Sequence, residues 1–320
     1  MAHMPSESVD ARARSHRFTR MKPAVRTWMA LLLATACTGE RAPGNDTVVV
    51  EGSPPDDPSR PPRVSTWNRA AGAMFAVRAP NGPQAWVVNP AYGDAHLLDT
   101  LTAAVWDVEG EPLVLLDGAQ VVGTGRITGL RYDSTCAGWP MATLATDSAT
   151  AWRVAFPEGA VEGTPFDSLP TLAAADSAER TRAGALAASR LPDDTVAAFR
   201  GRPFTVRQAN RFSIGGDTIV TLFEVVRLVA QEANPLQEQL LIMTEQGMSQ
   251  EPANVFYGRE VGAEETMGSI ELLGVLRVRA TGRLALLIRR DRETGFILEW
   301  IERSSRGTWS VRWRSAIDSC

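Results

Sequence analysis

Short apolar runs separated by turn-forming residues recur along most of the chain, and they constrain its fold more than any other feature. A Pro-Asn-Gly-Pro turn at 80–83 separates two such runs, and Asp117-Gly118 separates two more. Turn signals about every 8–12 residues predict antiparallel strands joined by hairpins rather than alternating strands and helices. Strands are expected at 73–79, 84–89, 113–116, 119–122, 127–132, 151–156, 204–214, 218–230, 237–244, 270–278, 284–289, 296–303 and 308–314.

The last two predicted strands show the clearest pattern. Apolar side chains occupy every second position on both arms, namely Phe296, Leu298 and Trp300, then Trp309, Val311 and Trp313. A period of two on both arms of a hairpin predicts one buried face. The three tryptophans are therefore expected to be buried cross-strand aromatics. The alternative is an exposed stacking platform for sugars or a partner.

The middle of the chain has a different composition. Residues 172–190 contain eight alanines and scattered charges, interrupted by Gly184. Alanine has the highest intrinsic helix propensity, and Thr171 or Asp176 is suited to cap a helix here. Pro192 begins a further short helical turn that ends near Arg200. We therefore expect a helical insert at 171–200.

These patterns together predict the fold class. We expect a mainly β, antiparallel sandwich or irregular double-sheet domain at 66–320, with the helical insert near 171–200. A propeller-like array of short strands is the alternative.

The start of the chain has the pattern of an export signal. Residues 21–26 are cationic, and residues 27–36 are uncharged and mostly apolar. The apolar run is about half of the roughly 20 residues that a membrane-spanning helix needs. We therefore expect 1–36 to be a signal peptide. Residues 1–20 lack an apolar run and are interpreted as an over-long start before Met21.

The end of this signal carries a resemblance to a family. Ala34-Thr35-Ala36-Cys37 resembles the lipobox of bacterial lipoproteins, with Ala34 where that family usually has Leu. The resemblance implies that Cys37 receives a diacylglyceryl group and becomes the new N-terminus. Thr38 stands where an Asp would signal inner-membrane retention, so the outer membrane is implied in a cell with two membranes. The alternative is ordinary secretory cleavage near Ala36, with an incidental cysteine.

The segment behind Cys37 is typical of a tether. Residues 37–65 are rich in Pro, Gly, Ser and Asp, which predicts a disordered, semi-extended chain. Six of the 33 basic residues and two of the 37 acidic residues precede Cys37, so the remainder carries a net charge of −8. That balance gives no electrostatic reason to expect a nucleic-acid partner.

The cysteine count adds one expectation. If Cys37 carries lipid, Cys136 and Cys320 remain. Export to an oxidising compartment favours a disulfide between them. The alternative is two free, buried thiols.

Histidine chemistry is poorly supported. His96 is the single histidine after the predicted signal peptide, and Asp94 and Asp99 lie near it in sequence. No Ser or Cys nucleophile is identifiable beside it, so a surface or turn histidine is the default interpretation. One histidine cannot form a multi-histidine zinc site. No catalytic or metal-binding residue is therefore predicted.

Two other motifs favour structural roles. The glycines at 123–129 have the wrong spacing for a dinucleotide loop and precede strand-like residues, which predicts a turn or bulge. No cofactor site is predicted. The adjacent acids Asp193-Asp194 and Glu264-Glu265 are interpreted as solvated caps and loops. A glycosidase pair needs no proximity in sequence, so an enzyme using dispersed Asp and Glu residues stays open.

Residues 271–287 bear a weak resemblance to the calcium-loop hairpins of FG-GAP-type repeats. The hydrophobic frame matches, but Arg277, Arg279 and Thr281 stand where the family has Asp. Calcium requires several anionic oxygens. The resemblance therefore implies a strand–turn–strand shape and no metal.

The sequence favours a lipid-anchored extracytoplasmic protein that binds or scaffolds at the cell envelope without catalysis. Its expected partners are the membrane, through lipid on Cys37, and an unidentified protein or glycan. Whether it is an enzyme stays open, and the leading alternative is an extracytoplasmic hydrolase using dispersed Asp/Glu residues. A small envelope assembly factor is a third hypothesis, which would show a large exposed apolar patch.

Overall fold

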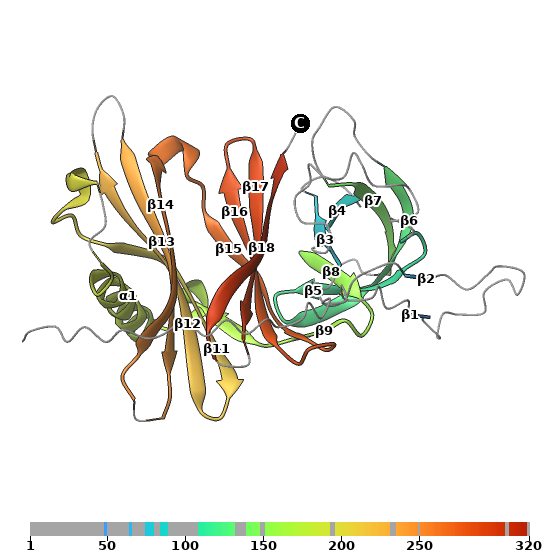
Figure 1. Ribbon diagram of the computed structural model, residues 1–320, viewed down its shortest axis with the longest axis horizontal. Helices are drawn as coiled ribbons and strands as arrows, with labels where there is room; N and C mark the ends of the chain where they lie inside the picture. The colour runs from blue at the N-terminus through green and yellow to red at the C-terminus, as the bar shows by residue number, and fades with distance from the viewer. Residues whose placement is uncertain are drawn as a thin grey trace, which may run out of the picture. The chain divides into compact units, whose positions relative to one another are not determined.

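The computed structural model describes a mainly β chain (Figure 1). It describes residues 48–49, 64–65, 74–79, 84–88, 108–131, 139–147, 151–192, 196–230, 235–248, 250–304 and 307–318. All of these belong to one compact unit, 45–320. Two short strands, β1 (Val48–Val49) and β2 (Val64–Ser65), pair with each other near its start.

Six strands between 75 and 157 close into an antiparallel barrel in the order β3-β4-β7-β6-β5-β8. The strands are β3 (Phe75–Arg78), β4 (Gln84–Val88), β5 (Pro112–Asp117), β6 (Gln120–Arg131), β7 (Met141–Thr146) and β8 (Val154–Pro157). The glycine-rich segment lies inside β6, where the register shifts twice. The predicted bulge is therefore confirmed, and it allows one long strand to curve around the barrel.

Two five-stranded antiparallel sheets follow the barrel. The first, called the helix-covered sheet, has the order β10-β11-β12-β13-β14. Its strands are β10 (Phe166–Ser168), β11 (Thr205–Gly215), β12 (Thr218–Val229), β13 (Leu236–Gln246) and β14 (Ala253–Ala263). The second, called the central sheet, has the order β18-β17-β16-β15-β9. Its strands are β9 (Val161–Gly163), β15 (Ile270–Val278), β16 (Leu284–Arg292), β17 (Gly295–Arg303) and β18 (Trp309–Asp318).

The central sheet is buried on both faces. Leu286, Ile288 and Ile301 face the helix-covered sheet in one apolar core. Leu287, Leu298 and Trp300 face the opposite way and share a core with the barrel strands. Phe75 of the barrel stacks on Trp300, with ring centroids 6.1 Å apart. Burial on two sides explains why these strands contain continuous apolar runs as well as alternation.

Helix α1 (Ala174–Ser189) covers the outer face of the helix-covered sheet (Figure 1). It packs at short range, because a Cβ at Gly184 would lie 2.7 Å from the Phe223 ring and 2.8 Å from Val206. Ala187 and Ala188 are buried in the same contact. The alanine and glycine content therefore reflects close packing as well as helix propensity.

Short 3₁₀ turns flank the helix, namely η5 (Leu169–Thr171) and η6 (Ala197–Phe199), and a third, η7 (Glu264–Thr266), follows β14. The predicted insert at 171–200 is confirmed, but the predicted caps are wrong. The N-cap of α1 is Ala173, which has no side-chain bond. The Thr171 hydroxyl instead bonds the Ser168 carbonyl.

The mainly β, antiparallel fold with packed sheets is confirmed, and the strands form a barrel and two five-stranded sheets rather than propeller blades. One detail of the predicted last hairpin is wrong. Trp300 pairs with Trp313, but the next residue, Ile301, pairs with Val311, so Arg312 forms a bulge. The bulge turns Trp309 toward the core between the sheets and Trp313 toward the barrel core. Phe296, Leu298 and Trp300 do share one face, as predicted.

Candidate functional site

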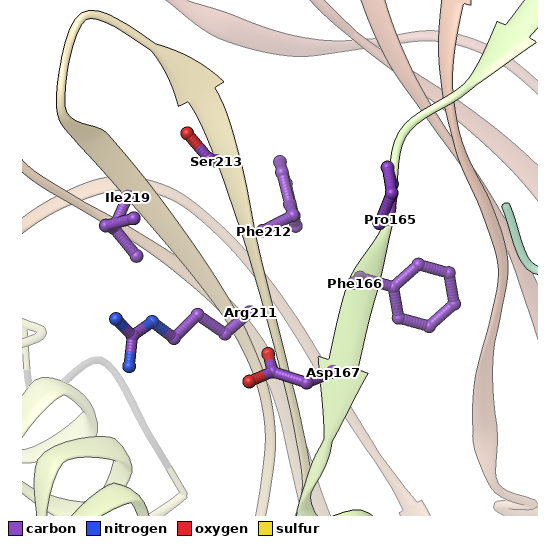
Figure 2. Close-up of a pocket in the computed structure, with 7 residues that line it drawn as sticks. All are labelled: Pro165, Phe166, Asp167, Arg211, Phe212, Ser213 and Ile219. Atoms are coloured by element: carbon purple, nitrogen blue, oxygen red, sulfur yellow. The ribbon is translucent and has the colours of Figure 1, made fainter.

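An open depression of about 460 Å³ lies at the edge of the helix-covered sheet (Figure 2). It forms beside the start of β10, where β11 continues past its last paired residue, because β10 pairs only with residues 210–212 of the longer β11. Its lining residues are Pro165, Phe166, Asp167, Arg211, Phe212, Ser213 and Ile219. The depression therefore combines an apolar wall with three polar side chains.

Charge is unevenly distributed in this depression. Arg211 and Asp167 are cross-strand partners, and Figure 2 shows their side chains on the same side of the strands. Asp167 is engaged elsewhere, because its carboxylate accepts two bonds from Arg180 of α1, at 2.8 and 3.4 Å. Arg211 is exposed and has no ion pair within the described ranges. Phe212 is only 3% exposed and, with Phe166, packs into the core between the two sheets. The site therefore presents one unpaired, exposed cation, which suits an anionic group.

A second group of polar residues is buried between the two sheets. Glu224 is 4% exposed and faces the central sheet among apolar neighbours. Its carboxylate accepts a 2.8 Å bond from Nε2 of Gln239 and a 3.4 Å bond from the backbone N–H of Ile270. Gln239 also donates to the carbonyl of Gly268 at 3.0 Å. These bonds hold the crossover from β14 to β15.

Burial raises the pKa of Glu224, because the charged carboxylate loses its hydration. The bonds from Gln239 and Ile270 oppose this shift, as do Arg207 and Arg290. The nearest cation is distant, with Arg207 Nη1 3.9 Å from Glu224 Oε1. Glu224 is therefore a buried carboxyl group with a raised pKa.

The same interior holds a chain of ion pairs around Arg290. Its Nε lies 3.1 Å from Oε2 of Glu299, and its Nη1 lies 3.7 Å from Oε1 of Glu260 on the opposite sheet. Arg292 also pairs with Glu260, and Arg314 pairs with Glu299. Both carboxylates are therefore matched by two guanidinium groups each, which is the arrangement that a buried charge requires.

A third polar group lies on the other face of the helix-covered sheet. Glu238 is fully buried and pairs with Arg227, and its Oε1 lies 3.2 Å from Nε of Arg259. Arg227 donates to the carbonyl of Phe199, and Arg259 donates to that of Pro192. These two hydrogen bonds therefore connect the segment after α1 to the helix-covered sheet.

Most of the candidate functional residues named from the sequence lie outside the residues that the structure describes. Cys37, Cys136 and Cys320 lie outside the described residues, as do His96, Asp94, Asp99, Asp193 and Asp194. The lipidation site and the disulfide therefore stay predictions. Glu264 and Glu265 are exposed, as expected of solvated acids.

The three tryptophans do not form a platform. Trp300, Trp309 and Trp313 are 1%, 5% and 7% exposed. The Trp309 indole donates to Glu245 at 2.6 Å, and Trp313 packs edge-on against Phe75 and Trp139. Their interpretation as buried aromatics is confirmed.

The segment 271–287 forms the expected strand–turn–strand hairpin, in which Arg277 pairs with Leu284. The Arg277 guanidinium donates to the carbonyl of Gly282 at 3.0 Å, so it closes the turn. Among the residues that the structure describes, no three His, Cys, Asp or Glu side chains gather closely enough to hold a metal ion.

The depression and the buried ion pairs were missed by sequence reasoning, because each joins residues far apart in the chain. Within the described ranges, none of the helices is long and apolar enough to cross a membrane. Comparisons with protein-family models, with curated proteins and with solved structures found no match for the chain.

Proposed function

We propose that the protein is a lipid-anchored, non-catalytic binding or scaffolding protein of the cell envelope. In this proposal residues 1–36 are removed, Cys37 carries the lipid, and residues 37–65 hold the β-rich domain away from the membrane. A Cys136–Cys320 disulfide completes the exported form. The outer membrane is the expected location in a cell with two membranes.

The observation that carries a binding role is the contrast between the depression and the interior. The depression is open and presents Arg211, whose charge no described acid neutralises. The buried acids are instead engaged by arginines or by backbone groups. An exposed cation without an acidic partner supports recognition of an anionic group, whereas buried carboxylates engaged by arginines or backbone groups support a structural role.

The extracytoplasmic hydrolase is the second candidate, and Glu224 is the observation in its favour. A carboxyl with a raised pKa is suited to act as a general acid. Its hydrogen-bond partners, however, are protein groups that form the sheet crossover. Hydrolysis of a chromogenic ester or glycoside by the wild type, lost in Glu224→Gln, would establish the hydrolase instead.

The anchor is tested by the intact mass of the protein purified from membranes. We expect a chain that begins at Cys37, carries lipid, and weighs two hydrogens less than its reduced form. A soluble chain with another N-terminus would contradict the anchor.

The binding site is tested by a photoreactive amino acid at Ser213 in living cells. We expect a discrete cross-linked product that Arg211→Glu abolishes, because the substitution reverses the free charge. The same amino acid at exposed Asp176 on α1 is the control and should give no such product. Equal cross-linking at both positions would contradict a specific site.

A further inference from the structure

Two neighbouring glutamines on one face of β13 are fully buried but only partly hydrogen-bonded. Gln237 and Gln239 are both 0% exposed. Oε1 of Gln237 accepts a 2.6 Å bond from Nη2 of Arg207, and Nε2 of Gln239 donates to Glu224 and to the carbonyl of Gly268. The other two amide atoms, Nε2 of Gln237 and Oε1 of Gln239, have no hydrogen-bond partner among the described residues. Leaving buried polar atoms unpaired is costly, so each requires an explanation.

Turning either amide over does not satisfy these atoms. A reversed Gln237 would point its NH₂ group at the Arg207 guanidinium, which is donor against donor. A reversed Gln239 would point its oxygen at the Glu224 carboxylate and the Gly268 carbonyl, which is acceptor against acceptor. The present partners therefore fix both orientations. The glutamines need a further group that accepts from one and donates to the other.

The ion pair beside the glutamines has the same need. Nη1 of Arg207 lies 3.9 Å from Oε1 of Glu224, which is too far for a direct hydrogen bond. A polar contact of this length is typically bridged by water. Arg207 thus adds a second donor and Glu224 a second acceptor to the free atoms of the two amides.

We propose that one water molecule is bound between Gln237 and Gln239 and bridges Arg207 to Glu224. Water accepts two hydrogen bonds and donates two, which matches the two donors and two acceptors of the site. A cation there would face the Arg207 guanidinium and the NH₂ group of Gln237. An anion would face the Glu224 carboxylate and the oxygen of Gln239. The mixed lining therefore selects a neutral molecule that is both donor and acceptor.

The water extends a network that connects the two sheets. Glu224 of β12 already accepts from the backbone N–H of Ile270, and Gln239 of β13 donates to Gly268, so both contact the crossover into the central sheet. Arg207 belongs to β11 and is too distant to join Glu224 directly. Through the water, the third strand of the helix-covered sheet is coupled to the same crossover.

The test is a crystal structure of the full chain at a resolution that shows ordered water. We expect one water within about 3.2 Å of Nε2 of Gln237 and of Oε1 of Gln239, with a third bond to Arg207 or Glu224. A site without such a water overturns the proposal, as does a direct bond between the two glutamines or occupation by an ion.

Gln237→Met tests whether the amide holds the water, because it removes the free donor and keeps the length of the side chain. We expect the water to be lost. The matched control is Leu241→Met, which introduces the same residue on the same face of β13 with little change in volume and should keep the water. Far-UV circular dichroism checks folding, and Gln237→Leu replaces Gln237→Met if that variant does not fold. A water retained without Gln237, or lost in Leu241→Met, overturns the proposal.

Discussion

The two faces of the helix-covered sheet each bury a carboxylate, and the two are stabilised in different ways. Glu238, under the helical insert, is matched by Arg227 and Arg259. Glu224, between the sheets, relies mainly on an amide and a backbone N–H, with its nearest cation at 3.9 Å. The first lies in direct contact with two guanidinium groups, whereas burial raises the pKa of the second. Two carboxylates can therefore be similarly buried and still differ in how they are stabilised, because their hydrogen-bond and ion-pair partners differ.

The largest effect is expected from the arginine that links the two sheets. Arg290→Leu leaves Glu299 buried with only Arg314 beside it. We expect a loss of about 3–5 kcal/mol in the free energy of unfolding, measured with urea, because an uncompensated buried charge is costly. The double variant Arg290→Leu/Glu299→Leu should recover much of the loss. Arg153→Leu, which breaks two exposed ion pairs, is the control and should cost about 0–1 kcal/mol.

A smaller effect is expected on the helical side. Glu238→Gln removes the charge shared by Arg227 and Arg259, but both keep a backbone carbonyl as acceptor. We expect a loss of about 2–3 kcal/mol. Because these arginines hold the segment after α1, limited proteolysis should cut at 190–202 before the sheet unfolds. Unchanged protease resistance there would show that the ion pairs do not hold the insert.

The smallest effect is expected at Glu224, and its sign depends on pH. The folded state holds this proton more tightly than the unfolded state, because burial raises the pKa above its ordinary value of 4.5. The stability contributed by Glu224 is thus fully present below that value and is lost as pH rises through the folded-state pKa. Relative to the wild type, Glu224→Gln should gain stability as pH rises above 4.5. Parallel stability profiles over pH 4–8 would exclude this assignment.

The alternation and turn signals were sufficient to predict most strands. The prediction of 270–278 coincides with β15, and 218–230 differs from β12 by one residue. β14 was missed because Gly258, Arg259, Glu260 and Gly262 interrupt its apolar pattern. Arg259 and Glu260 form ion pairs with residues distant in sequence, and β14 is an edge strand. A local sequence pattern predicts neither feature.

The candidate site was less predictable than the fold. The lining of the depression depends on β10 beginning at Phe166, opposite Phe212, which leaves the end of β11 without a partner on that side, and no periodicity shows this. The Arg312 bulge likewise places Trp309 and Trp313 on opposite faces, because one extra residue between two positions inverts the face of one relative to the other.

The double burial of the central sheet limits how this chain can be divided. Leu276, Leu287 and Trp300 complete the core of the barrel, although they belong to strands that follow it by more than a hundred residues. The barrel is therefore not a module that could be exchanged or deleted. A chain shortened to 160–318 would present a continuous apolar face to solvent and aggregate. The two parts should accordingly melt in a single transition.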